Sequence, residues 1–114
     1  MLKDNIFQKI IDKQIPAAIV FEDDRCLAFR DINPQAPTHV ILIPRKVIPT
    51  HDDLTDADRD LLGHLHLVAV KLAKQFGLSA GYRLVINCRE SAGQTVPHLH
   101  FHLLGGRDLH WPPG

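Results

Sequence analysis

The feature that most constrains the fold of this chain is the stretch Pro97–Gly106, P-H-L-H-F-H-L-L-G-G, in which polar and apolar residues alternate. Strict alternation is typical of a half-buried β-strand, because successive side chains of a strand point to opposite faces. The pattern therefore predicts a strand with His98, His100 and His102 on one face and apolar side chains on the other. Neighbouring imidazoles on such a strand would lie about 6.6 Å apart, close enough to act on one small ligand.

Length and composition limit the classes of protein to which this chain can belong. A chain of 114 residues with 45% hydrophobic residues is expected to form a single domain over residues 1–114. Thirteen basic and thirteen acidic residues cancel, so no net field attracts nucleic acid or an anionic membrane. No apolar run is long enough for a membrane span, and the two cysteines lack CxxC spacing. We therefore expect a cytoplasmic protein with no nucleic-acid or membrane partner.

The remaining pattern predicts two helices and four further strands. The first helix begins at Asp4 or Asn5 and stops before Pro16; the second begins at a capping-box pattern at Thr55 and ends at Gly77. Apolar runs predict strands at Ile19–Phe21, Cys26–Phe29, Thr38–Pro44 and Tyr82–Cys88. With the histidine strand, this order of elements predicts an α+β fold built on a five-stranded antiparallel sheet.

A row of three imidazoles is compatible with several functions. Alternating histidines can bind zinc, or a neutral imidazole can attack phosphorus while a protonated neighbour donates to phosphate oxygens. A strand rich in histidine but without chemistry is the third possibility. Two imidazolium ions about 6.6 Å apart repel by roughly 2.5 kcal/mol at an effective dielectric constant of 20, so only part of the row can be protonated at once. This favours nucleophilic catalysis over the other two.

The loop before the histidine strand favours an anion site. Ser91–Thr95 offers backbone N–H groups, a hydroxyl and an amide, and Asn87 at the end of the preceding strand could reach the same place.

Several longer motifs carry a resemblance to a known family. They are the triad pattern at His98–Leu104, I-F-Q-K-I-I at Ile6–Ile11, D-I-N-P-Q-A-P-T-H at Asp31–His39, G-Q-T-V at Gly93–Val96, and L-L-G-G-R-D-L-H-W-P-P-G at Leu103–Gly114. Together they resemble the histidine triad (HIT) superfamily, and within it the Hint branch of histidine triad nucleotide-binding proteins. The resemblance implies the HIT-like fold and a homodimer in which the sheets of two chains join.

The resemblance also implies an activity, that of a purine nucleoside phosphoramidase. Such enzymes hydrolyse P–N bonds of AMP-type substrates such as adenosine phosphoramidate and AMP-lysine, and some members process aminoacyl-adenylates, without a metal or other cofactor. By motif, His100 would be the nucleophile that forms a nucleotidyl-histidine intermediate. His102 would contact phosphate and assist the leaving group, with His98 and His39 in support.

The resemblance further implies residues that bind the substrate or the partner chain. Phosphate would be held by Asn87, Gly93, Gln94, Thr95 and Val96, and the ribose by Asp31. The base would lie among the apolar residues Ile6, Phe7, Ile10, Phe29 and Ile32. Trp111 in the tail would pack on the partner. A nucleotide-binding regulator with incidental turnover needs the same pocket and is the alternative function; a zinc-binding protein is the less favoured one.

Overall fold

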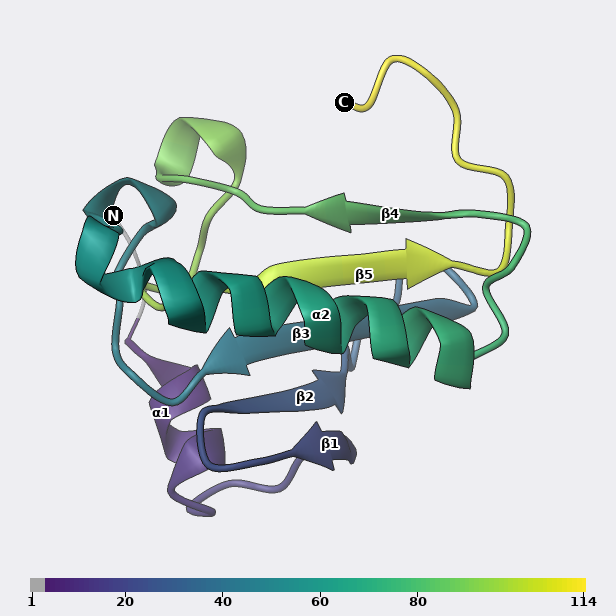
Figure 1. Cartoon of the computed structure of the whole chain (residues 1–114). Coiled ribbons are helices and arrows are strands. Elements are labelled where there is room, and N and C mark those ends of the chain that lie inside the picture. The colour runs from purple at the N-terminus through teal and green to yellow at the C-terminus, as the bar shows by residue number, and fades with distance from the viewer. Residues whose placement is uncertain (1–3) are drawn as a thin grey trace.

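A five-stranded antiparallel sheet organises the computed structural model, which describes residues 4–114 (Figure 1). The strand order is β1-β2-β3-β5-β4. The strands are β1 (Ile19–Glu22), β2 (Cys26–Arg30), β3 (Thr38–Pro44), β4 (Tyr82–Val85) and β5 (Phe101–Gly105). The helices are α1 (Ile6–Ile11) and α2 (Arg59–Gln75), with short 3-10 turns at His51–Asp53, Asp56–Asp58 and Glu90–Ala92. The predicted α+β class is confirmed.

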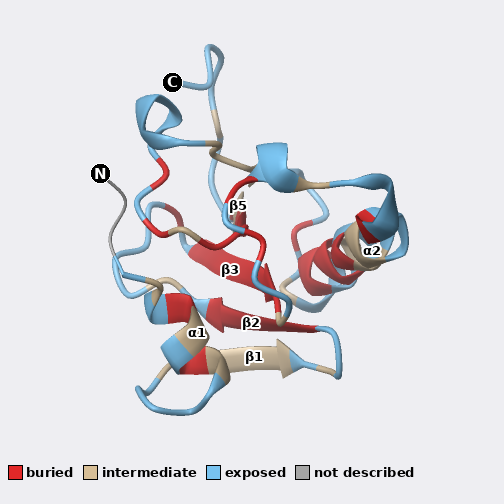
Figure 2. Ribbon diagram, turned by 90° about the vertical axis from the view of Figure 1, so that its left-hand side faces the viewer, coloured by how far each residue is buried: buried red, intermediate tan, exposed pale blue. Residues whose placement is uncertain are grey.

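The sheet is covered by a different helix on each face, and the central strands are buried between them (Figure 2). On the α2 face, Ala28 and Leu42 pack with residues of α2 such as Leu65. On the α1 face, Phe29 and Ile41 pack with residues of α1. Because a strand alternates its side chains, strands buried on both faces are apolar without interruption, as β2 and β3 nearly are.

Helix α2 begins at the expected capping box. The Thr55 backbone N–H donates to the Asp58 carboxylate at 3.1 Å, and the Thr55 side chain accepts from the Asp58 backbone. The opening turn is a 3-10 turn, so the α-helix proper starts at Arg59. It ends at Gln75, and Gly77 follows with a φ of 69°, a left-handed conformation that glycine adopts without strain.

The histidine strand is shorter than predicted. Strand β5 begins at Phe101, so only His102 of the three histidines lies in it, while His98 and His100 belong to the segment that leads into it. The register that pairs Leu42 with Phe101 would place Leu99 opposite Pro44. Proline has no backbone N–H to offer a ladder. In addition, the Pro44 carbonyl already accepts a hydrogen bond from the His98 ring, so the ladder stops before this point.

The predicted alternation nevertheless holds through this segment. Leu99, Phe101 and Leu103 are buried in the cluster on the α2 face. The histidines therefore project toward the α1 face, and the rings of His98 and His100 both contact Phe7 of α1.

Strand β4 is also shorter than predicted, because its pairing with β5 ends at Val85 opposite His102. The segment from 86 to 88 continues without a ladder toward the 3-10 turn at Glu90–Ala92. Among residues 4–114, no helix combines the length and the apolar character that crossing a membrane requires.

Candidate active site

Four histidines meet on the α1 face of the sheet. The ring centroids of His100 and His102 are 5.0 Å apart, and those of His39 and His102 are 5.1 Å apart. Strand β3 supplies His39, strand β5 supplies His102, and the segment before β5 supplies His98 and His100. The structure thus brings together the histidines that the sequence singled out.

His98 is a buried, fully hydrogen-bonded side chain. It has no exposed surface, its Nε2 lies 2.7 Å from the carbonyl oxygen of Pro44, and its Nδ1 lies 2.9 Å from Nδ2 of Asn5. A carbonyl can only accept, so Nε2 carries the proton and Nδ1 accepts from the Asn5 amide. Both ring nitrogens are occupied, so His98 offers neither a lone pair nor an N–H to a ligand.

His100 has one nitrogen fixed and the other available. Its Nδ1 lies 2.6 Å from the backbone carbonyl oxygen of His98, so Nδ1 carries the proton and donates. In the neutral ring, Nε2 then holds the unprotonated lone pair. The edge-to-face contact with Phe7, at 4.9 Å between ring centroids, further fixes the ring plane. This is the arrangement that an imidazole nucleophile needs.

His39 and His102 form a directed chain of hydrogen bonds. The backbone N–H of Gln35 donates to Nδ1 of His39 at 3.0 Å, so in neutral His39 the proton sits on Nε2. That Nε2 lies 2.8 Å from Nδ1 of His102, which accepts. Neutral His102 therefore carries its proton on Nε2, where it can donate to a ligand. Oδ2 of Asp31 lies 3.4 Å from Nε2 of His39, where its charge can stabilise a cationic pair.

Burial keeps these imidazoles neutral. Burial lowers the pKa of His98, His100 and His39 below the ordinary value of 6.5. For His102, burial and the neighbouring rings of His100 and His39 lower the pKa to about 4. The Asp31 carboxylate opposes the shift at His39, His100 and His102 without reversing it. At neutral pH the cluster therefore offers one lone pair, at His100, and one N–H donor, at His102.

The same cluster includes a group that could ligate a metal. The ligand atoms of Asp31, His39 and His102 lie within 4.8 Å of one another. The sequence alone did not place a carboxylate beside the histidines; the structure places Asp31 there because its loop enters β3 next to His39.

The residues predicted to hold phosphate lie in the loop that leads to the histidines. Gln94 is 2% exposed, and its side chain binds backbone groups: Nε2 donates to the carbonyls of Pro49 and Val96, and Oε1 accepts from the Arg89 N–H. Thr95 is exposed. Gly93 adopts a φ of 95°, and a Cβ there would lie 3.8 Å from Nδ2 of Asn87. Val96 is buried on the α1 face.

The residues predicted to hold the base divide into three groups. Phe7, Ile10 and Phe29 are buried together on the α1 face, where Phe7 also touches His98 and His100. Ile6 is 43% exposed, at the start of α1. Ile32 is 99% exposed and joins neither apolar cluster of residues 4–114.

Two contributors to the site were not anticipated. The first is Asn5, which was expected only as a helix cap: its Oδ1 accepts from the Gln8 N–H at 3.0 Å, while its amide donates to His98. The second is the Pro44 carbonyl. Neither carries a signal in the sequence, because both contacts join segments that are distant along the chain.

Comparison with known proteins places the chain in a family. The HIT domain family matches residues 12–109, and the chain belongs to it. An uncharacterized HIT-like protein of Synechocystis sp. is 57% identical over 114 residues, the whole of both chains. The crystal structure of a HIT family hydrolase from Legionella pneumophila superposes with a TM-score of 0.95 at 53% identity, covering 96% of this chain and 99% of that one.

A more distant neighbour is the histidine triad nucleotide-binding protein of Candida albicans. Its structure superposes with a TM-score of 0.81 at 32% identity, covering 95% of this chain and 82% of that one. The predicted superfamily is confirmed, while membership of the Hint branch stays a prediction.

Proposed function

We propose that this protein is a purine nucleoside phosphoramidase. Its substrates would be AMP-type P–N compounds such as adenosine phosphoramidate and AMP-lysine, with aminoacyl-adenylates as further candidates. The observation that carries the proposal is the hydrogen bond from Nδ1 of His100 to the His98 carbonyl, which leaves the Nε2 lone pair free. The hydrolase title of the Legionella relative and the nucleotide-binding title of the Candida relative support the same chemical class.

The proposed reaction has two steps. Nε2 of His100 attacks the α-phosphorus, the P–N bond breaks with its electron pair passing to nitrogen, and the amine leaves with an added proton. Water then attacks the nucleotidyl-histidine and passes a proton to His102, the P–N bond to Nε2 breaks with its electron pair returning to that nitrogen, and AMP is released. His102 donates first to the phosphate oxygens and then to the leaving nitrogen.

Binding of the substrate changes the protonation of the buried cluster. The neutral His102 N–H is a hydrogen-bond donor but a weak acid. A bound phosphate anion favours the cationic form of His102, so it raises the pKa of that ring from about 4. The negative charge of Asp31, whose Oδ2 lies 3.4 Å from Nε2 of His39, also favours the cationic form of His102. No metal or other cofactor enters these steps, and we expect EDTA to leave turnover unchanged.

AMP release from adenosine phosphoramidate tests this proposal directly. Wild-type protein should turn over, and rapidly quenched samples should carry a nucleotidyl adduct on the triad peptide, at His100. His100→Ala should abolish turnover but keep AMP affinity within about tenfold, because the other contacts to AMP remain. His66→Ala, an exposed histidine of α2, serves as the matched control.

Several outcomes would overturn the proposal or its assignments. Tight AMP binding with negligible turnover would identify a nucleotide-binding regulator instead. Near-normal turnover in His100→Ala, or an adduct on His98 or His102, would remove the assigned nucleophile. Activity that is lost on chelation and restored by zinc would turn attention to Asp31, His39 and His102 as ligands.

We further propose that the protein is a cytoplasmic homodimer without nucleic-acid or membrane partners. Strand β4 is an edge strand, and at its Tyr82 end lies an open hollow of about 710 Å³, lined in part by the tail residues Arg107–His110. Trp111 is 82% exposed beside it in sequence. An unpaired strand edge and an exposed tryptophan are suited to a second copy of the chain.

A further inference from the structure

A second cluster of metal-ligating side chains lies away from the histidine site, where the β1–β2 turn meets α2. Asp23 belongs to the turn, Cys26 is the first residue of β2, and His64 projects from α2. Oδ2 of Asp23 lies 2.7 Å from Nε2 of His64, and the three potential ligand atoms all lie within 4.8 Å of one another. Nothing in the proposed reaction uses these residues.

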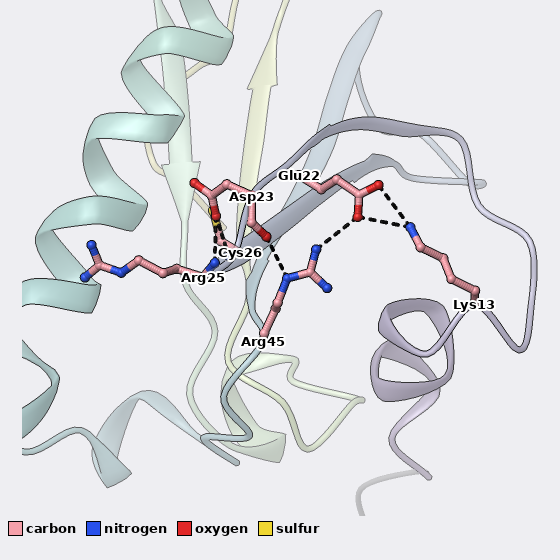
Figure 3. A network of polar contacts seen from close by, with 6 residues as sticks. All are labelled: Lys13, Glu22, Asp23, Arg25, Cys26 and Arg45. Carbon is pink, nitrogen blue, oxygen red and sulfur yellow. Dashed lines mark hydrogen bonds and ion pairs between the residues drawn. The ribbon is translucent and has the colours of Figure 1, made fainter.

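The Asp23 carboxylate is held in a fixed orientation. Its Oδ1 accepts the backbone N–H groups of Arg25 and Cys26, each at 2.8 Å (Figure 3), which leaves Oδ2 for His64. Burial would raise the pKa of Asp23, but these hydrogen bonds outweigh burial and lower the pKa to about 2. The Asp23 carboxylate is therefore charged, and available as an oxygen ligand, at any pH well above about 2. Hydrogen bonds to a ligating carboxylate are a regular feature of metal centres.

The third member of the cluster, beside Asp23 and His64, is the Cys26 thiol. Cys26 has no exposed surface, and its Sγ lies within 4.8 Å of the Asp23 carboxylate. Burial, with the nearby Asp23 charge, raises the pKa of the thiol to about 12. Without a cation the thiol is therefore protonated and unreactive. A bound cation that favours sulfur displaces that proton, because coordination deprotonates a thiol outright.

We propose that Asp23, Cys26 and His64 bind a thiophilic divalent cation of the zinc class, which fastens the β1–β2 turn to α2. Oxygen, sulfur and imidazole nitrogen are all zinc ligands, at about 2.0 to 2.3 Å from the metal. Two ligands at those distances stand about 3.3 to 3.8 Å apart in a tetrahedral site, so Oδ2 and Nε2 need to separate only slightly from 2.7 Å. The side chains of His64 and Asp23 are 25% and 26% exposed, which leaves the fourth position open to water.

The cationic side chains near this cluster bind groups other than the Asp23 carboxylate. The guanidinium of Arg45 donates from Nε to the Asp23 backbone carbonyl and from Nη2 to Glu22. Glu22 also pairs with Lys13, so this carboxylate holds two of the local cations (Figure 3). The side chain of Arg25 extends away from the Asp23 carboxylate (Figure 3).

Cobalt(II) provides a probe that distinguishes this site from the histidine cluster. Thiolate ligation gives a near-ultraviolet charge-transfer band, which the sulfur-free group Asp31, His39 and His102 cannot produce. Cys88 is the only other cysteine of the chain. We expect wild-type protein to develop the band to a limit of one cobalt per chain, and added Zn²⁺ to abolish it by displacement.

Variants assign the band to its ligands. Cys26→Ala should lose it; His64→Ala, which changes a partly exposed side chain and should fold normally, should weaken cobalt binding at least roughly tenfold. Cys88→Ala and His66→Ala, which changes an exposed residue two positions away on α2, should retain the wild-type band.

A second readout is thermal. Zn²⁺ should raise the unfolding midpoint of wild-type protein and of His66→Ala, but not of His64→Ala, since a cation that binds only the folded state stabilises it. The proposal is overturned if the wild-type protein gives no thiolate band, or if the band survives in Cys26→Ala. It is equally overturned if the band disappears in Cys88→Ala while Cys26→Ala keeps it. None of these results bears on phosphoramidase turnover.

Discussion

Mild acid should destabilise this protein through its buried neutral histidines. In the unfolded chain a histidine gains its proton near pH 6.5, whereas folded His102 does so at about pH 4. Between these values the unfolded state binds more protons, so the free energy of unfolding falls as the pH falls. A difference of about 2.5 pKa units corresponds to about 3 kcal/mol for His102 alone. Burial lowers the pKa of His98, His100 and His39 as well, so they act in the same direction.

The pH window of this effect separates it from the usual acid unfolding by carboxylates. The carboxyl groups with lowered pKa values, Glu22, Asp23 and Asp58, have ordinary values of 4.5 or 3.8. The stability that they contribute is complete above those values and is lost only below them. A loss that begins near pH 6.5 and is well developed by about pH 4.5 therefore belongs to histidines.

Urea unfolding at stepped pH values and one fixed protein concentration measures this loss. Each histidine that is neutral in the folded state and protonated in the unfolded state adds up to about 1.4 kcal/mol per pH unit to the slope. His102→Gln should reduce the wild-type slope by about that amount, and His51→Gln controls for removing one exposed imidazole. A free energy of unfolding that stays flat between about pH 6.5 and 4.5 would refute the reasoning. An unchanged slope in His102→Gln would refute the part assigned to that residue.

Three further predictions concern the cap, a turn and the assembly. Asn5→Ala should lower the free energy of unfolding by about 1 kcal/mol through the lost helix cap, and further through the lost hydrogen bond to His98. Asn5→Asp should retain the cap and lose only the amide donor to His98. Urea unfolding of both variants measures the difference between their free energies of unfolding. Gly106→Ala should lower the free energy of unfolding by more than about 1 kcal/mol, because the φ of Gly106 is 89° and an added Cβ would lie 2.9 Å from Cβ of Pro37. Gly63→Ala, whose Cβ would enter open space on α2, should instead raise the free energy of unfolding. Sedimentation of the wild-type protein at micromolar concentration should give twice the 12.8 kDa protomer mass, and Trp111→Ala should show a smaller fraction of this dimer. A protomer-sized species in wild-type protein would contradict the proposed dimer.

The sequence predicted the elements of the fold because each is a local pattern. The alternation of His98, His100 and His102 with apolar residues correctly assigned the two faces of this segment. The length of the strand is not local information. It depends on the register with β3, which brings Pro44 opposite Leu99 and ends the ladder. The same limit explains β4, whose apolar run continues beyond the last residue that pairs with β5.

The candidate site was predictable in its residues and not in its hydrogen bonds. From the sequence, His100 is distinguished by having an imidazole on each side along one strand face. The structure distinguishes it differently: the His98 backbone carbonyl takes the Nδ1 proton, and the His98 ring turns away to Pro44 and Asn5. Contacts of this kind join residues 54 and 93 positions apart, so no spacing rule reveals them.

Burial favours one step of the proposed reaction and opposes the other. Attack requires an unprotonated Nε2 on His100, and burial provides it by lowering the pKa of that ring. Departure of the amine requires a proton, which the same burial removes from His102. The conflict is resolved when the phosphate of the substrate binds, because an anion beside His102 favours the protonated form of that ring. The Asp31 carboxylate further stabilises the cationic ring by its charge, while His100, whose Nδ1 is fixed on a backbone carbonyl, keeps its lone pair on Nε2. Two neighbouring rings can thus play different roles because their hydrogen-bond partners differ.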